Sequence, residues 1–258
     1  MARVAGGSEL ADQFSDHLWR RPWRIVGGAL LLWALLGPAA AQGLSVSPIN
    51  VQLTAGQMAA VVNLGNRGDR DISFQIRAYA WRQTETDDPL SPTEELAVSP
   101  PLGTIAPGAD QVARLVLRHP AQGREATYRI LVDELPPPAA AGNVRVAVRL
   151  SIPVFAEPKE RISPQVRWRV VTQGGQTWLM AANGGTRHLS VRNIKLRTAD
   201  GRDLQVETKL PPHILPGGAR RWPVLARGTP PRPSAVLRLT ADSDIGTVDE
   251  QVRVDAGP

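Results

Sequence analysis

The chain has 258 residues, and its 30 Lys and Arg against 24 Asp and Glu give a formal net charge of +6 at pH 7. It contains no cysteine, so disulfide bridges and thiol chemistry are excluded. The basic residues are spread along the chain and form no stripe interleaved with aromatic residues, so this surplus does not indicate nucleic-acid binding.

Residues 1–41 have the layout of a secretory signal. Arg20, Arg21 and Arg24 precede an apolar run over 25–36, and the alanines at 39–41 offer a small-residue cleavage site. A retained membrane anchor needs about 20 apolar residues, and this run is shorter. We therefore expect a cleaved signal peptide and an exported chain with no stable membrane insertion.

From residue 42 onward, short β-like runs alternate with Gly, Pro, Asn and Asp, and no long segment keeps a helical apolar period. This pattern predicts an all-β chain of two sandwich domains, 42–157 and 158–258. The strands expected in the first domain are 45–53, 58–64, 71–83, 112–118, 127–134 and 143–156. Those expected in the second are 165–172, 177–183, 189–198, 203–209, 221–225, 235–241 and 249–254.

The strand over 143–156 is the most distinctive. Its even positions form an unbroken apolar row: Val144, Val146, Val148, Leu150, Ile152 and Val154. Pro153 has no N–H for a sheet, which places at least part of the strand at an edge. Proteins normally blunt a long valine-rich edge because it aggregates, so a long one suggests pairing with another chain. Periodicity by itself also allows the row to face its own core.

The sequence gives little support for an enzymatic function. His119, His188 and His213 are isolated, and no phosphate loop, nucleophile elbow or zinc motif occurs after residue 41. Carboxylates at 87–88 and 94–95 lie in a Pro- and Thr-rich loop typical of a solvated turn. A glycosidase-like carboxylate pair stays open, because its spacing exists only in the folded chain. We expect no catalytic residue, no metal site and no cofactor.

Three groups of residues form a pattern in their order and spacing: Pro100-Pro101 with Ile105-Ala-Pro-Gly108, Gln111 and Arg114; Tyr128-Arg129 with Asp133-Glu-Leu-Pro136; and Arg149-Leu-Ser-Ile-Pro-Val-Phe155. Together they resemble the periplasmic chaperones of the chaperone–usher pathway, which assemble pili on Gram-negative cells. The resemblance covers nearly the whole chain after residue 41. It implies two immunoglobulin-like sandwiches in an L or boomerang arrangement, a periplasmic location, and pilin-like subunits and an outer-membrane usher as partners.

The resemblance also implies a mechanism. A pilus subunit is a sandwich that lacks its last strand, and the chaperone lends a strand of its own to fill the open groove. By position, the lent strand lies within 143–156, and the donated side chains are Val144, Val146, Val148, Leu150 and Ile152. The next subunit's own strand then displaces it.

In one respect the sequence departs from the family. Well-studied members hold the subunit's terminal carboxylate with two basic residues, but Asn50 and Pro153 occupy the matching positions here. Together with the motifs above, this loss resembles the archaic branch, which serves spore-coat-U-like subunits. We expect Arg129 to replace the missing anchor, with Arg77 as the second candidate, because a guanidinium binds a carboxylate in two places. The alternative is an ordinary ion pair between Arg129 and Asp133.

Family members fix the angle between their domains with a charged network. The matching positions here are Arg114, Glu134 and Asp244, and the alternative is three unrelated surface charges. A different class of function, a secreted adhesin or carbohydrate-binding module, would present clustered exposed aromatic residues. The tryptophans after residue 41 are scattered: Trp81, Trp168, Trp178 and Trp222.

Overall fold

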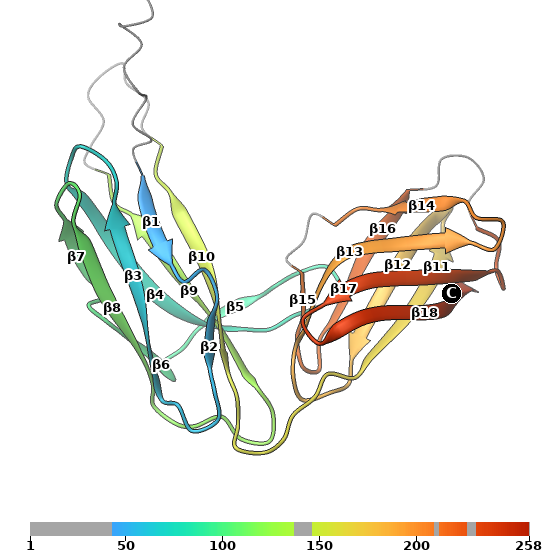
Figure 1. The fold of residues 1–258 in the computed structure, drawn as a ribbon, viewed down its shortest axis with the longest axis horizontal. Helices are drawn as coiled ribbons and strands as arrows, with labels where there is room; N and C mark the ends of the chain where they lie inside the picture. The colour runs from blue at the N-terminus through green and yellow to red at the C-terminus, as the bar shows by residue number, and fades with distance from the viewer. Residues whose placement is uncertain (1–42, 137–145, 209–211, 226–230, 258) are drawn as a thin grey trace, which may run out of the picture. The chain divides into compact units, whose positions relative to one another are not determined.

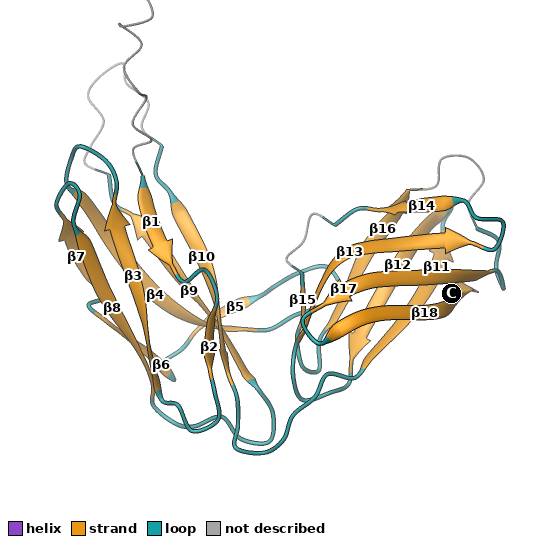
Figure 2. Ribbon diagram, viewed as in Figure 1, coloured by secondary structure: helices purple, strands orange, loops and turns teal. Residues whose placement is uncertain are grey.

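A computed structural model describes residues 43–136, 146–208, 212–225 and 231–257, where all regular secondary structure is β-strand (Figures 1 and 2). The predicted fold class is confirmed, because the strands form two immunoglobulin-like sandwiches. The predicted signal peptide over 1–41 and the donor residue Val144 lie outside the described residues. No helix long and apolar enough to cross a membrane is present in the described part of the chain.

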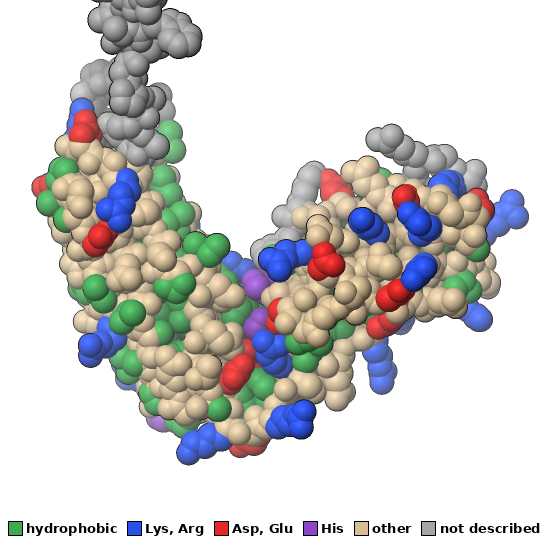
Figure 3. Space-filling model, in the orientation of Figure 1, with side chains coloured by type: hydrophobic (Ala, Val, Ile, Leu, Met, Phe, Trp, Pro, Cys, Tyr) green, Lys and Arg blue, Asp and Glu red, His purple; other side chains and the backbone are tan. Residues whose placement is uncertain are grey.

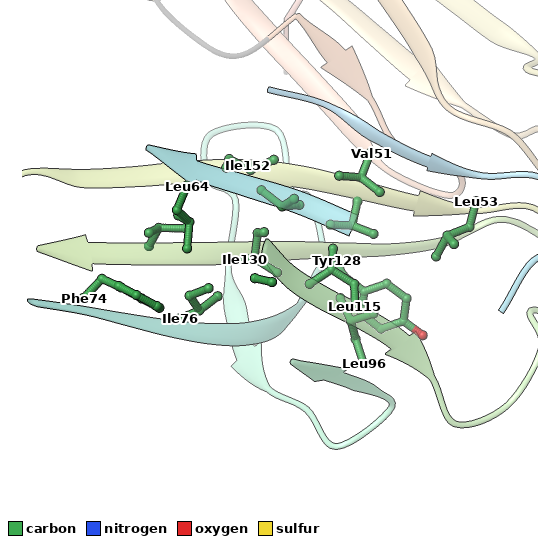
Figure 4. Packing of buried hydrophobic residues seen from close by; sticks show 14 of the residues in the cluster. Val51, Leu53, Leu64, Phe74, Ile76, Leu96, Leu115, Tyr128, Ile130 and Ile152 are labelled. Atoms are coloured by element: carbon green, nitrogen blue, oxygen red, sulfur yellow. The ribbon is translucent and has the colours of Figure 1, made fainter. Parts of the chain in front are cut away.

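Two sheets make the N-terminal sandwich. Its strands are β1 (Leu44–Ser47), β2 (Val51–Leu53), β3 (Ala59–Asn66), β4 (Ile72–Trp81), β5 (Leu90–Pro92), β6 (Leu96–Ser99), β7 (Leu102–Ile105), β8 (Asp110–Leu117), β9 (Ala126–Glu134) and β10 (Arg149–Ala156). One sheet has the order β1-β3-β8-β6, and the other has β2-β10-β9-β4-β5, with β7 also paired to β4. The alternate apolar residues of each strand meet between the two sheets, as the packing in Figure 4 shows.

The C-terminal sandwich closes on itself. Its strands are β11 (Val166–Gln173), β12 (Gln176–Asn183), β13 (Leu189–Thr198), β14 (Asp203–Val206), β15 (His213–Ile214), β16 (Ala219–Leu225), β17 (Val236–Ser243) and β18 (Gly246–Ala256). They pair in the order β14-β16-β12-β11-β18-β17-β13-β15, and a further β14–β13 pairing closes the path between its first strand and the strand before its last. Such a ring covers most strand edges, so the long open edges of the described chain belong to the N-terminal sandwich.

A buried asparagine at the end of one strand recurs in both sandwiches. Asn66 donates to the carbonyls of Arg70 and Ile105 at 2.6 and 2.8 Å and accepts from the N–H of Gly68 at 2.9 Å. Asn183 repeats the arrangement, with bonds to the carbonyls four residues on and of Ile214, and from the N–H two residues on. Each amide satisfies backbone groups that would otherwise be buried without a partner.

We expect Asn66→Ala and Asn183→Ala each to lower the free energy of unfolding by about 2–4 kcal/mol, because two carbonyls and one N–H lose their partner in a buried site. Urea denaturation of the variants measures this loss. Asn63, exposed on β3, provides the matched control, and Asn63→Ala should change the unfolding free energy by less than about 0.5 kcal/mol. Equal stability of Asn66→Ala and Asn63→Ala would contradict this role of the amide.

Candidate functional site

An open strand edge lies on β10. This strand pairs with β9 along its whole length, but β2 covers only Val154–Ala156 on the other side. The N–H of Glu134 donates to the carbonyl of Val148 at 2.9 Å, so the even positions of β10 direct their backbone groups to β9. The amides of Arg149 and Ser151 therefore point to the open edge, where Pro153, which lacks an N–H, also fits. The edge position expected from Pro153 is confirmed.

The apolar row of β10 leaves the core as it approaches this open end. Val154 and Ile152 are 0% and 3% exposed inside their own sandwich, where Figure 4 shows Ile152. Leu150 and Val148 are half-buried, and Val146 is 81% exposed. Burial therefore excludes Ile152 from the part of the row outside the core, which comprises Val146 and Val148, with Leu150 at the boundary because it packs partly against the core. The strand expected over 143–156 begins only at Arg149 among the described residues, because 146–148 have no regular structure, and 143–145 lie outside the described residues.

On the outer face of the same sheet, two arginines share one carboxylate. Arg77 donates to Asp133 at 2.6 Å, and Arg149 donates to the other oxygen of the same carboxylate. Burial opposes ionisation of Asp133, but the hydrogen bonds from Arg149 and Arg77 outweigh it and lower its pKa. These bonds join β4, β9 and β10 across the face where β10 begins. The second candidate anchor, Arg77, is therefore already paired. Asp133, the alternative partner considered for Arg129, is already bound by Arg77 and Arg149.

Arg129 projects from β9 on the same face, nearer the second sandwich. Its guanidinium lies 3.8 Å above the ring of Trp81 and donates to the hydroxyl of Ser151 at 2.9 Å. Its Nε–H is buried and has no hydrogen-bond partner among the described residues. Burial lowers the pKa of Arg129, the charge of Asp88 raises it, and Arg220 lowers it again. The result is a half-buried cation without an ion-pair partner in the described chain, next to the open edge.

Trp81 is itself held by a buried ion pair. Its ring N–H donates to Asp88 at 3.1 Å, and the same oxygen accepts from Arg220 at 2.6 Å and from Gln83 at 3.2 Å. Burial opposes ionisation of Asp88, but the bond and charge of Arg220 outweigh it, so the pKa of Asp88 is lowered. Arg220 is completely buried. These bonds fix the aromatic platform beneath Arg129, and the two arginines with one carboxylate leave a local charge of +1.

The expected network of Arg114, Glu134 and Asp244 is not formed. Arg114 is exposed on β8 in one sheet, whereas Glu134 ends β9 in the other sheet, and neither forms an ion pair with a described residue. Asp244 is bound instead by Arg187, at 3.0 Å, and by the N–H of Ser190 at 2.9 Å. The prediction that Asp244 binds a basic residue holds, but its predicted partners were wrong. Arg114 on β8 and Glu134 on β9 belong to opposite sheets, and Arg187 binds Asp244 instead.

Two histidines that are isolated in the sequence meet between the sandwiches. The ring of His188 lies 2.7 Å from the buried carboxylate of Glu125, which also accepts the N–H of His188 at 2.9 Å. The same ring stacks on Phe155 with 3.7 Å between centroids, and His213 meets both Phe155 and Trp81 edge-on. Burial lowers the pKa of His213 to about 4, assisted by the charges of His188 and Arg129. His213 is therefore neutral near pH 7.

Acidification should destabilise this junction. In the unfolded chain His213 takes up a proton near pH 6.5, but in the folded chain it does so only near pH 4. The unfolded state thus binds more protons between these values, and the free energy of unfolding falls by about 3 kcal/mol as the pH drops through this window. Denaturation at a series of pH values measures the slope. His213→Gln should remove most of it, whereas the same change at the exposed His119 should not. An unchanged slope in His213→Gln would contradict the prediction.

Of the residues that shape this site, Trp81, Asp88, Glu125 and Arg220 were not predicted as functional. Asp88 and Arg220 are 132 positions apart, so no local signal joins them. Trp81, Trp168 and Trp222 are buried and Trp178 is half-buried, which is not the cluster of exposed rings expected of a carbohydrate-binding module. The described residues contain no group of three metal-ligating side chains.

Comparison with known proteins agrees with this geometry. Residues 43–161 match the family model described as "Pili and flagellar-assembly chaperone, PapD N-terminal domain". A search of curated proteins gave no match. Residues 43–161 are therefore similar to the N-terminal domain of pilus-assembly chaperones.

Solved structures share the two-sandwich fold. The CsuC–CsuE chaperone–tip subunit complex from archaic Csu pili of Acinetobacter baumannii matches with 23% identity over 84% of this chain and 100% of that chain, with a TM-score of 0.62. The E. coli chaperone DraB matches with 20% identity over 83% and 98%, with a TM-score of 0.54. The Pseudomonas aeruginosa chaperone CupB2 matches with 17% identity over 81% and 100%, also with a TM-score of 0.54. The fold is that of chaperone–usher pilus chaperones.

Proposed function

We propose that this protein is a periplasmic chaperone that binds pilin-like subunits by donor-strand complementation and delivers them to an outer-membrane usher. The open edge of β10, with an apolar row that runs out of its own core, is the observation that carries this proposal. The likeness to a chaperone of Csu pili supports a place in the archaic branch. Export follows from the signal-like layout of residues 1–41.

Binding follows from strand addition. The outward amides of Arg149 and Ser151 bond to the subunit's edge strand, while Val146, Val148 and Leu150 enter its groove. Each apolar side chain that becomes fully buried stabilises the complex by about 1.5–3 kcal/mol before the cost of association. Ile152 stays in the chaperone's own core, so one continuous row stabilises two sandwiches at once. Val144 extends the same row by position.

Arg129 anchors the subunit's terminal carboxylate. A carboxylate entering this face meets a planar cation that is already positioned by Trp81 and Ser151 and lacks a counter-ion. The anchor fixes the register of the added strand, because the end of the subunit is held at one point along β9. Release needs no nucleotide: the next subunit's own strand displaces β10 and gives a better-packed sandwich.

Co-expression with a subunit encoded beside this chain tests the function. We expect a one-to-one complex that co-purifies from the periplasm, and loss of soluble subunit when the chaperone is left out. A subunit that is equally soluble in both cultures, and that never co-purifies, would overturn the proposal.

A further inference from the structure

We infer that Arg220 of the C-terminal sandwich keeps the carboxylate anchor open, because it holds the carboxylate of Asp88 and so prevents that group from neutralising Arg129. This role rests on the proposed function, in which Arg129 binds the subunit's terminal carboxylate. Arg220 acts through Asp88 and is therefore a positioning residue. The C-terminal sandwich thereby takes part in capture, although the donor row and Arg129 both belong to the N-terminal sandwich.

A loop of the N-terminal sandwich is bound to the C-terminal sandwich. It comprises residues 82–89, between β4 and β5, and we call it the arm. At its base the N–H of Arg82 donates to the carbonyl of Pro89 at 3.1 Å. Further along, the carbonyl of Glu85 accepts the N–H of Arg221, on β16, at 3.0 Å. The arm is therefore attached to the C-terminal sandwich through its backbone as well as through its side chains.

Gln83 is the first of these side chains. Its amide N–H donates to the carbonyl of His213 at 2.9 Å, and its own carbonyl accepts the N–H of Leu215 at 3.0 Å. A methyl group added at Gly218 would lie 3.1 Å from Cβ of Gln83, so the arm packs closely at a point where the C-terminal sandwich has no side chain. These contacts hold the arm, and the carboxylate that it carries, against the C-terminal sandwich.

Asp88 is that carboxylate, and one of its oxygens receives all its described bonds. This oxygen accepts from Arg220 at 2.6 Å, from the ring N–H of Trp81 at 3.1 Å and from Gln83 at 3.2 Å. Arg220 is completely buried and forms no other ion pair in the described part of the chain. A buried charge is costly without a counter-ion, so Arg220 and Asp88 depend on each other.

The anchor lies beside the same carboxylate. Trp81 carries Arg129 3.8 Å above its ring and donates its ring N–H to Asp88 at 3.1 Å. Burial lowers the pKa of Arg129 and the charge of Asp88 raises it, so the two charges are close enough to act on each other. They form no ion pair in the described chain, where the carboxylate is bound to Arg220 instead. Without Arg220, the cation left for Asp88 to pair with would be the anchor.

Two single variants break this ion pair in opposite ways. R220Q keeps a hydrogen-bond donor for Asp88 but removes the positive charge, so the carboxylate turns to Arg129 and occupies it. D88N keeps an oxygen that accepts the ring N–H of Trp81 but removes the negative charge, so Arg129 stays free. If the pair only stabilised the fold, both variants would have the same effect on the subunit.

Titration with the subunit encoded beside this chain, with its natural C-terminus and with a C-terminal carboxamide, tests this role on the mature protein. We expect the unaltered protein and D88N to prefer the carboxylate at least about 30-fold, and R220Q to prefer it less than about threefold. Basic and acidic side chains also lie next to each other on the surface of the C-terminal sandwich (Figure 3). One exposed pair there, Arg238 with Asp249 at 2.6 Å, provides the matched controls, and neither R238Q nor D249N should change the preference.

If a single variant does not fold, the double variant R220Q/D88N replaces it, because it leaves no buried charge without a partner. This variant should prefer the carboxylate as the unaltered protein does. A full preference in R220Q, or its loss in D88N or in the double variant, would overturn the inference and leave the proposed function standing. Equal affinity of the unaltered protein for both subunit forms would overturn the anchor and this inference with it. Failure to bind either form would overturn the proposed function itself.

Discussion

We expect Arg129→Ala to lower the affinity for the subunit by at least about 100-fold without unfolding the chaperone. The subunit's carboxylate would then be buried without a charged partner, and truncation of one member of such a pair costs about 2–5 kcal/mol. The fold should tolerate the change, because Arg129 has no ion pair to lose in the described chain and contributes its stacking on Trp81 and one exposed hydrogen bond to Ser151. Co-purification and titration with the purified subunit measure the effect.

Three further variants separate charge from shape at this anchor. Arg129→Lys keeps the charge but loses the planar fork and should fall between the unaltered protein and Arg129→Ala. Arg118→Ala, which removes an exposed cation paired with Glu94 in the same sandwich, should have no effect. Arg77→Ala should have a small effect, because Arg77 is already bound to Asp133. Full binding by Arg129→Ala together with loss in Arg77→Ala would reassign the anchor to Arg77.

The second large effect is expected at the start of the donor row. Val146→Asp should reduce subunit binding at least about tenfold, because a carboxylate would have to enter an apolar groove without a partner. The free chaperone should be as stable as before, since Val146 is 81% exposed. Subunit titration measures the binding, and urea denaturation measures the stability.

Ala147 gives an unusually close control for that experiment. It is the next residue, it is also exposed, and period two directs its side chain away from the groove. Ala147→Asp introduces the same charge at nearly the same place and should bind the subunit almost normally. Equal binding by the two variants would show that the row does not enter the subunit.

The strands of the second sandwich were predicted closely from period two, because each has one buried face. The stretch after Trp81 was harder to interpret. It contains the short strands β5, β6 and β7, none of which is among the predicted strands. Strands of three or four residues show too little alternation to be distinguished from turns. The two-residue strand β15 was missed for the same reason.

The candidate site also combines features that the sequence predicts with features that only the folded chain shows. Alternation predicts Val146, Val148 and Leu150 on one face, but alternation does not say where a row leaves its own core. Only the folded structure shows that β2 pairs with β10 no further than Val154, that Ile152 is buried and that Leu150 is at the boundary. The ion pairs of the site depend on the fold even more strongly. Folding brings Asp88 and Arg220 together from distant positions in the sequence, and no spacing rule predicts such a pair.

Amide hydrogen exchange at the edge of β10 tests the central claim most directly. In the free protein the N–H groups of Arg149 and Ser151 point away from β9 and should exchange quickly, while that of Leu150, directed to β9, exchanges slowly. In a purified complex with a subunit, we predict that exchange at Arg149 and Ser151 slows by at least about 100-fold. Unchanged exchange at these two amides, in a complex whose subunit is demonstrably bound, would contradict strand donation by β10.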